Sequence, residues 1–253
     1  MPSKPSIVII PGSFSGPELY TILGSQLVGH GYEVFVGALQ SASHTPPERP
    51  ATMKEDAAYF RGIAEFLASQ GKDVVVLGHS YGGIVATECV KGVTRAERKE
   101  QGKPGGVVRV VYLASVIGDV GQGSLEAMGG QLGPFIRTLG DYMHMDGNAA
   151  APVIYNDLPE KEALEWANRG RCHSTTSFLD PLTFTAVDHV PVTYIHTARD
   201  SILIPEYQKA SVEKLKKQNA KNVSTVTINT GHMPNVTAPE VTAKGVIEAI
   251  SAA

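Results

Sequence analysis

The stretch that decides the fold is Asp73–Ala86, which reads DVVVLGHSYGGIVA. A β-branched apolar run ends abruptly in Gly-His-Ser-Tyr-Gly, and small and apolar residues continue beyond it as a helix. This G-x-S-x-G pattern predicts a sharp strand-to-helix turn that holds Ser80 in a strained backbone conformation. Glycine is needed at positions 78 and 82 because side chains there would collide with neighbouring backbone. Ser80 is therefore the candidate nucleophile, at a helix N-terminus that favours developing negative charge.

Bulk composition narrows the class of protein. The chain has 253 residues, 42% hydrophobic and 19% charged, which is enough for a full core in one domain. Its net charge of −3 gives no electrostatic case for a nucleic acid or an anionic membrane as partner. Cys89 and Cys172 form neither a metal-ligand spacing nor a disulfide framework. The sequence lacks a signal-peptide pattern and a transmembrane stretch, so we expect a cytoplasmic protein.

Strands alternate with helices along most of the chain. Besides the Ser80 strand, apolar runs predict strands at Ile7–Ile10, Glu33–Ala38, Val107–Leu113, Val192–His196 and Val223–Ile228. Helices are predicted at Glu18–His30, Met53–Ser69, Pro205–Asn219 and Pro239–Ser251, and the charged stretch Thr94–Gly106 is predicted to be an exposed connection. The alternation favours a mainly parallel sheet, with ligands bound at the carboxyl ends of its strands.

One region breaks this alternation. Between Ile117 and His189 glycines are frequent, no strong strand signal occurs, and apolar side chains are scattered. Short helices are predicted at Ser124–Met128, Pro134–Asp141 and Pro159–Arg169. A long excursion with this much apolar content favours a helical cap over the Ser80 crevice rather than disorder.

A serine hydroxyl needs a base within hydrogen-bond reach, and the best of eight histidines is His232. It follows the last strand in NTGHMP, at a carboxyl-end loop beside Ser80. His79 is instead expected to pack and hydrogen-bond beneath the turn. The acid that orients the imidazole is predicted to be Asp200, just past the penultimate strand, and Asp119, after the strand that ends at Leu113, is its rival.

Acyl transfer also requires hydrogen-bond donors for the developing oxyanion. One predicted donor is the amide of Tyr81, the residue after the nucleophile, and the second is the amide of Ser13 in the loop after the first strand. Gly12 would let that loop approach closely. Phe14 is equally suited to wall the acyl pocket or to join the core.

These landmarks together resemble the α/β-hydrolase superfamily. Pro11–Phe14, Gly78–Gly83, Ala198–Asp200 and Gly231–His232 match its four motifs in order, over nearly the full chain. The resemblance implies a single α/β domain over residues 1–253, with about six mainly parallel strands flanked by helices. It also implies a helical cap, residues 118–189, inserted after the fourth strand.

Within the superfamily, the chain looks like the small cytosolic branch that contains plant methylesterases, hydroxynitrile lyases and fungal hydrolases of secondary metabolism. Tyr194–Gln208 is similar to the acid-bearing region of that branch, as is Cys172–Ser174 with Pro181 near the end of the cap. The chain departs from the family pattern in two ways. Larger members carry an antiparallel hairpin before the first motif strand, whereas this chain begins almost directly at that strand, so we expect a six-stranded sheet. The predicted oxyanion loop reads Pro-Gly-Ser-Phe where His-Gly is common.

The leading functional hypothesis is a serine esterase or lactonase that cleaves a small, fairly apolar substrate through an acyl-enzyme, with no metal or organic cofactor. The alternatives are a lyase or a carbon–carbon bond cleaving or cyclising enzyme that uses Ser80 and His232 as acid and base, and a ligand-binding receptor. Met233 stands where a hydroxynitrile lyase would, by resemblance, carry a nearby cation, which disfavours that route. Substrate identity and oligomeric state stay open. Candidate substrate-contacting residues are Gly12, Phe14, Tyr81, Met143, Trp166 and His173.

Overall fold

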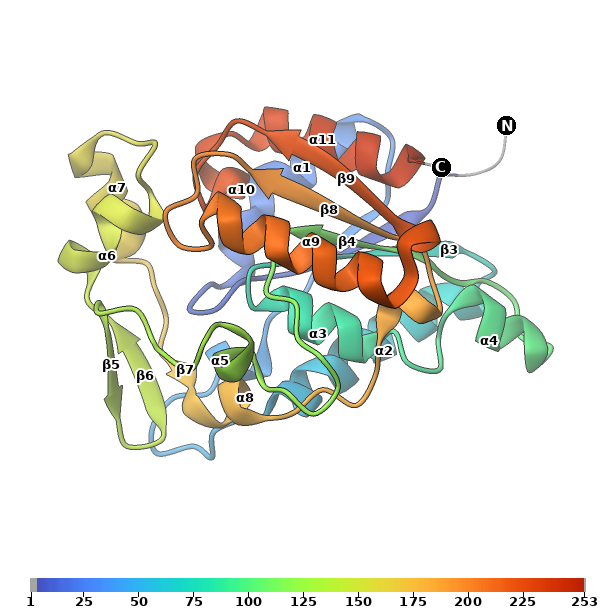
Figure 1. The fold of residues 1–253 in the computed structure, drawn as a ribbon, viewed down its shortest axis with the longest axis horizontal. Helices are drawn as coiled ribbons and strands as arrows, with labels where there is room; N and C mark the ends of the chain where they lie inside the picture. Colours follow the sequence, from blue (N-terminus) through green and yellow to red (C-terminus); the bar gives the residue numbers. More distant parts are fainter. Residues whose placement is uncertain (1–3, 253) are drawn as a thin grey trace.

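In the computed structural model, which describes residues 4–252, six strands form one parallel sheet in the order β2-β1-β3-β4-β8-β9 (Figure 1). The strands are β1 (Ser6–Ile10), β2 (Val34–Val36), β3 (Asp73–His79), β4 (Gly106–Leu113), β8 (Val192–Thr197) and β9 (Val223–Ile228). The predicted six-stranded α/β fold is confirmed, and β3, which carries the Ser80 turn, lies in the interior of the sheet.

Helices cover both faces of this sheet. One face carries α2 (Met53–Ser69), α3 (Gly82–Cys89) and α9 (Pro205–Asn219), and the other carries α1 (Thr21–Gly29) and α11 (Pro239–Ser251). The strand sequences explain this arrangement, since successive side chains point to opposite faces. In β1, Val8 and Ile10 join the core on the α2 side while Ile7 and Ile9 join the core on the α11 side.

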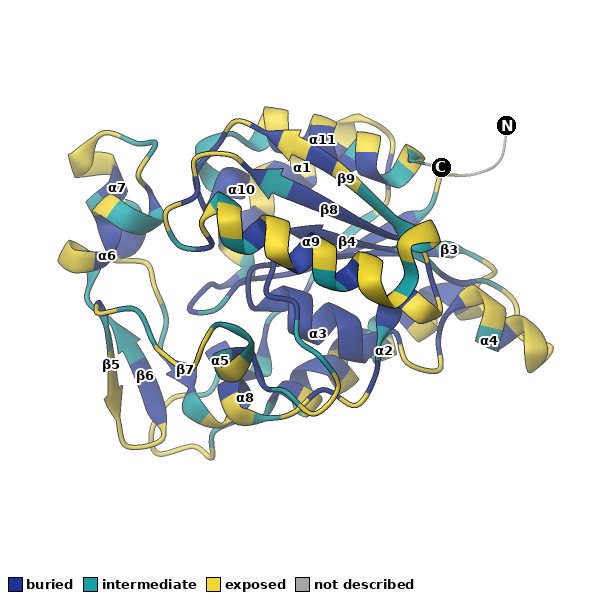
Figure 2. Cartoon of the chain, in the orientation of Figure 1, coloured by how far each residue is buried: buried dark blue, intermediate teal, exposed yellow. Residues whose placement is uncertain are grey.

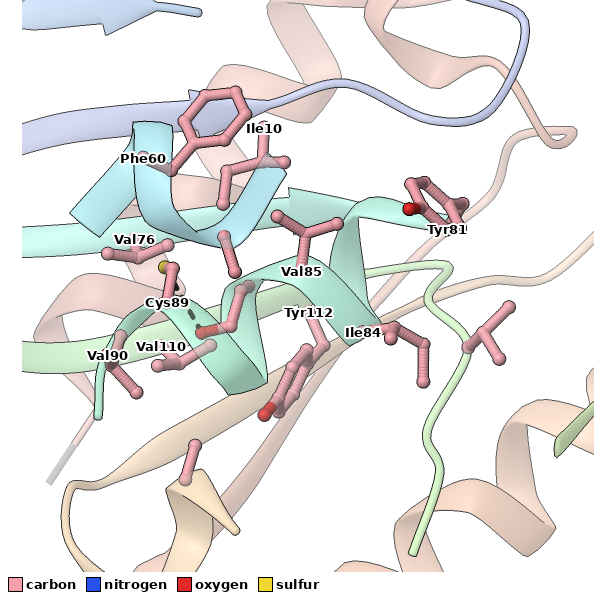
Figure 3. Close-up of a cluster of buried hydrophobic side chains, with 14 of the residues drawn as sticks. Ile10, Phe60, Val76, Tyr81, Ile84, Val85, Cys89, Val90, Val110 and Tyr112 are labelled. Atoms are coloured by element: carbon pink, nitrogen blue, oxygen red, sulfur yellow. Dashed lines mark hydrogen bonds between the residues drawn. The ribbon is translucent and has the colours of Figure 1, made fainter. Parts of the chain in front are cut away.

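Figure 3 shows the core beneath the turn. Phe60 of α2 lies beside Ile10 of β1, and Val76 of β3 and Val85 of α3 belong to the same cluster; all four are fully buried. Figure 2 shows that α3 is buried around most of its surface, which explains why its sequence is mainly small and apolar rather than amphipathic. The helix that follows Ser80 is therefore fixed by packing from the sheet and from α2 together.

The remaining elements are short helical segments. They are η1 (Pro17–Tyr20), η2 (Gln40–Ala42), α4 (Arg95–Glu100), η3 (Ala186–Asp188), η4 (Ala220–Asn222) and α10 (Pro234–Thr237), of which η3 lies at the end of the cap and the others lie outside it. The stretch predicted to be an exposed connection thus contains a helix, α4. A reciprocal capping pair, Thr94 with Glu97, begins that helix and explains why so short a segment forms one. No helix within residues 4–252 is long and apolar enough to cross a lipid bilayer.

The cap contains both helices and strands. Its helices are α5 (Ser124–Ala127), α6 (Gly147–Ile154), α7 (Glu160–Ala167) and α8 (Thr175–Leu179), and its strands are β5 (Ile136–Leu139), β6 (Tyr142–Met145) and β7 (His173–Ser174). The three strands form an antiparallel sheet in the order β5-β6-β7 beside the main domain (Figure 1).

The helix predicted at Pro134–Asp141 is therefore wrong. The chain turns back within two residues between Leu139 and Tyr142, and Gly140 provides the positive φ of 60° at that turn. Tyr142 and Met143 of the returning strand are buried, so contacts with the main domain stabilise the hairpin. The helices predicted at Ser124–Met128 and Pro159–Arg169 are present as α5 and α7.

Candidate active site

Ser80 lies at the turn between β3 and α3 with a φ of 53°, in the left-handed region that non-glycine residues seldom adopt. A Cβ on Gly78 would lie 2.4 Å from the carbonyl oxygen of Gly82, and one on Gly82 would lie 2.6 Å from that of Ile10. Both glycines are thus sterically required, and the predicted strained turn is confirmed.

Three side chains from separate loops meet at this turn. The Ser80 hydroxyl lies 3.1 Å from His232 Nε2, and His232 Nδ1 lies 2.8 Å from Asp200 Oδ2. All three are buried, with at most 8% of their surface exposed. Because the carboxylate only accepts hydrogen bonds, Nδ1 carries the proton and Nε2 offers its lone pair to the hydroxyl. This is the arrangement that makes an imidazole a base toward a serine.

Asp200 is held as a carboxylate by its surroundings. Burial acts to raise the pKa of its side chain, but the His232 imidazole and hydrogen bonds from the backbone of Ile202 and the Thr197 hydroxyl outweigh it and leave that pKa below its ordinary value. Asp119, the rival acid, is half exposed and lies 3.1 Å from Lys214 Nζ, on α9. Of the two acids, the structure brings only Asp200 to His232.

His79 lies beneath the site and links two of its loops. The Gly12 amide donates to the Tyr20 hydroxyl, which donates to His79 Nδ1, and His79 Nε2 donates to the His232 carbonyl oxygen at 2.8 Å. Complete burial lowers the pKa of His79 to about 3, so the ring is neutral. His79 thus packs and hydrogen-bonds under the turn as predicted, whereas no sequence pattern indicated Tyr20.

The two predicted oxyanion donors face the same space. Ser13 and Tyr81 both line the cavity that Ser80 and His232 line. Within residues 4–252 neither backbone amide donates a hydrogen bond to a protein group, whereas the amides of Gly12 and Phe14 on either side of Ser13 both do. Two unoccupied amides beside a serine are suited to bind an oxygen that gains negative charge.

A model of the alpha/beta hydrolase family matches residues 7–244, which is nearly the whole chain. The chain belongs to the alpha/beta hydrolase family. The structure shows the same strand–turn–helix placement of Ser80 that this family's nucleophile motif requires.

Relatives of this alpha/beta hydrolase include "Probable hydrolase R7" of Phoma sp., which is 35% identical over 94% of this chain and 95% of the relative. Polyneuridine aldehyde esterase superposes with a TM-score of 0.75 and 17% identity over 97% of this chain and 98% of that one. The methylesterase MES16 from Arabidopsis gives a TM-score of 0.69 and 20% identity, with coverages of 98% and 99%. The two solved structures are similar in fold.

A cavity of about 590 Å³ opens at Ser80, of the size that holds a drug-sized ligand. Its walls come from the loop after β1 at residues 13–15, the 128–136 segment of the cap, α6 and the 201–204 loop. Among residues 4–252 no Lys, Arg, Asp or Glu side chain lines it. Most of the lining is apolar and includes Val116, Leu132, Phe135, Ile136, Val153, Ile154, Phe178 and Ile202. Such a pocket favours an uncharged, largely apolar ligand.

The predicted substrate contacts are only partly placed at this cavity. Phe14 and Tyr81 line it, but Gly12, Met143, Trp166 and His173 do not. Gly12 abuts His79 and Ser80, where an added Cβ would lie 3.1 Å from His79 Nδ1. Met143 and His173 are fully buried behind the wall, where Met143 packs within the core. Trp166 packs against the α11-side core under the Arg169 guanidinium.

Two cap residues at the active-site loops had no sequence signal. Asn156 donates to the Arg199 carbonyl oxygen and to the Ser201 hydroxyl, on either side of Asp200. Asp157 accepts from the Gly231 amide, next to His232. The cap is therefore hydrogen-bonded to the loops that carry Asp200 and His232. These contacts depend on how α6 and α7 fold, which no local pattern reveals.

Proposed function

We propose that this alpha/beta hydrolase cleaves an uncharged, largely apolar carboxylic ester or lactone through a covalent intermediate on Ser80. The observation that carries the proposal is the unbroken hydrogen-bonded series from Ser80 through His232 to Asp200, at 3.1 and 2.8 Å. Its hydroxyl end opens into a pocket that no Lys, Arg, Asp or Glu side chain lines within residues 4–252. Binding alone would need no such aligned nucleophile and base.

The proposed reaction has two halves. His232 Nε2 takes the Ser80 proton as the hydroxyl oxygen attacks the ester carbonyl, and the amides of Ser13 and Tyr81 bind the resulting oxyanion. When the intermediate collapses, the C–O bond to the alcohol breaks and His232 gives its proton to that leaving oxygen. Water then attacks the acyl-serine with His232 again as base, which releases the acid and restores Ser80.

Asp200 has a supporting part in both halves. When His232 is protonated, the carboxylate 2.8 Å from Nδ1 stabilises the imidazolium. Hydrogen bonds from Thr197, Ile202 and Leu203 fix the carboxylate itself, so the imidazole keeps the tautomer that the attack needs. The Asp200 loop therefore orients the base before substrate arrives.

Lyase chemistry of the hydroxynitrile type has less support. Met233, which follows the base, lines the cavity, and no Lys or Arg does so within residues 4–252. A leaving anion such as cyanide would find no cation there. The names of two similar folds, a polyneuridine aldehyde esterase and a methylesterase, agree with ester cleavage.

The test is turnover of p-nitrophenyl butyrate, a small apolar ester, by the wild type and by Ser80→Ala. The variant should lose turnover completely and keep its melting temperature, because only the hydroxyl is removed. Ser25→Ala, at an α1 serine that does not line the cavity, is the matched control and should retain full activity. Turnover near the wild-type level in Ser80→Ala would refute the proposed function.

A further inference from the structure

His173 is a fully buried histidine for which the reaction above has no use. It begins the last cap strand, β7, and its Nδ1 lies 3.3 Å from the backbone amide of Phe14 in the oxyanion loop. We propose that His173 is a positioning residue for the oxyanion hole: by engaging the Phe14 amide, it keeps the neighbouring Ser13 amide free and aimed at the substrate. This inference rests on the proposed ester chemistry of Ser80.

The backbone at Phe14 needs external support. Its φ is 60°, a conformation that is costly for a bulky side chain and persists only where surrounding structure imposes it. Here the cap imposes it from two sides. The Phe14 amide donates to His173 Nδ1, and the Phe14 carbonyl oxygen accepts from the Arg171 amide at 2.8 Å. The cap segment 171–173 therefore holds both polar groups of the strained residue.

The hydrogen bonds on the far side of the ring fix which nitrogen accepts. The Ser177 hydroxyl donates its one proton to the Ser174 carbonyl oxygen at 2.8 Å, so it can only accept from His173 Nε2, 3.0 Å away. The proton therefore resides on Nε2, and Nδ1 presents a lone pair to the Phe14 amide. Burial lowers the pKa of His173 to about 3, which keeps the ring neutral over the working pH range.

The same ring also contacts the residue that carries the other oxyanion donor. His173 packs edge-on against Tyr81, with ring centroids 4.9 Å apart, and Phe178 stacks on Tyr81 at 5.2 Å. On its other side the Tyr81 hydroxyl donates to the buried Asp56 carboxylate at 3.0 Å. One cap side chain thus touches both halves of the oxyanion hole, which come from loops far apart in the sequence.

Two substitutions at position 173 separate positioning from bulk packing. In His173→Leu the acceptor is lost, so Phe14 can relax and the Ser13 amide moves away. His173→Asn keeps an acceptor oxygen near the place of Nδ1. Since loss of one oxyanion donor costs about 10²–10³ in kcat, displacement of one should lower kcat of His173→Leu by about 10–100-fold. KM should stay near the wild-type value, and His173→Asn should recover most of the loss.

Three readouts make the experiment specific. The first is kcat and KM for p-nitrophenyl butyrate. The second is the rate at which a fluorophosphonate labels Ser80. This reaction also develops negative charge on an oxygen in the oxyanion hole. The third is inhibition by an aryl trifluoromethyl ketone, whose adduct with serine is an oxyanion. In His173→Leu its inhibition constant should rise by the same factor by which kcat/KM falls.

If His173→Leu fails to fold, Ser177→Ala is the second variant that tests the positioning role. It removes the acceptor that orients Nε2–H and should lower kcat a few-fold at unchanged KM. A folded His173→Leu with wild-type kcat, or a rise in KM alone, would overturn the positioning role while the ester function stands. Equal losses in His173→Leu and His173→Asn would overturn it as well. A wild type that neither turns over the ester nor reacts with the fluorophosphonate would remove the proposed function and this inference with it.

Discussion

The carboxyl edge of the parallel sheet and the cap above it supply the two sides of the same site, but they are encoded differently. At the sheet edge, Ser80, Asp200 and His232 lie in the turn or loops that follow β3, β8 and β9, and the strand order brings them together. In the cap, β6 pairs with β7, which is remote in sequence, and the β5–β6 hairpin depends on the burial of Tyr142 and Met143. Local sequence patterns therefore mark the three residues at the sheet edge, whereas tertiary packing places the cap residues that line the pocket.

The largest effects should come from the sheet edge. His232→Ala and Asp200→Asn should each lower kcat by about 10⁴-fold, because the first removes the base and the second disturbs its tautomer. Asp119→Asn is the matched control: its carboxylate pairs with Lys214 on α9, so kcat should stay at the wild-type value. Steady-state kinetics on p-nitrophenyl butyrate measures all three. A large loss in Asp119→Asn would mean that the acid has been misassigned.

The glycine positions of the turn should tolerate no side chain. A Cβ at Gly78 meets the Gly82 carbonyl oxygen at 2.4 Å, so Gly78→Ala should lower the free energy of unfolding by about 3 kcal/mol. Gly62→Ala is the control inside α2, where an added Cβ would have no atom within 4 Å. Its free energy of unfolding should rise by about 0.5–1 kcal/mol. Urea denaturation compares the two. Similar midpoints for both variants would contradict the steric account.

Asp56 is a buried residue of α2 that accepts a hydrogen bond from the Tyr81 hydroxyl. Burial, its largest influence, raises its pKa from 3.8 to about 6 despite hydrogen bonds from Ser41 and Tyr81. The folded state thus keeps the proton to higher pH than the unfolded chain. The stability that this group contributes is complete below about pH 4 and lost as pH rises through about 6.

Asp56→Asn cannot ionise and should lack this dependence. The difference in unfolding free energy, variant minus wild type, should increase between pH 4 and pH 6.5 by up to about 3 kcal/mol. Chemical denaturation at several pH values measures it. Parallel stability curves for the two proteins would show that the Asp56 pKa is not raised.

Smaller effects, on selectivity rather than chemistry, should come from the cap wall. Phe135 lines the cavity and is 9% exposed, so Phe135→Ala should raise KM for a long-chain p-nitrophenyl ester by about tenfold. The kcat for p-nitrophenyl acetate, which is too short to reach the wall, should be unchanged. Equal losses on both esters would place Phe135 in the structural core instead.

The same contrast explains what the sequence could predict. β-Branched apolar runs mark the buried strands, so the sheet could be predicted. The stretches between and after these runs gave α2, α9 and α11, several of these elements to the residue. The Ser80 turn could be predicted because its glycines have a steric reason. Ile136–Leu139 could not be recognised as a strand, because its partner β6 and the packing of Tyr142 and Met143 decide its conformation.

Side-chain roles in the cap were equally hidden. His173 resembled a substrate contact in the sequence, yet the structure places it behind the wall against Phe14 and Tyr81. Asn156 and Asp157, which anchor the Asp200 and His232 loops, have no local motif. Hydrogen bonds between segments far apart in the chain can be assigned only once both segments are placed.

The central claim is that the Ser80 oxygen becomes acylated, and rapid-quench mass spectrometry of the intact protein with p-nitrophenyl butyrate tests it most directly. Our account predicts a transient adduct of one butyryl group, mapped by peptide digestion to Ser80, which is absent from Ser80→Ala and retained in Ser25→Ala. Turnover of the ester with no adduct at Ser80, or with an adduct on another residue, would contradict it.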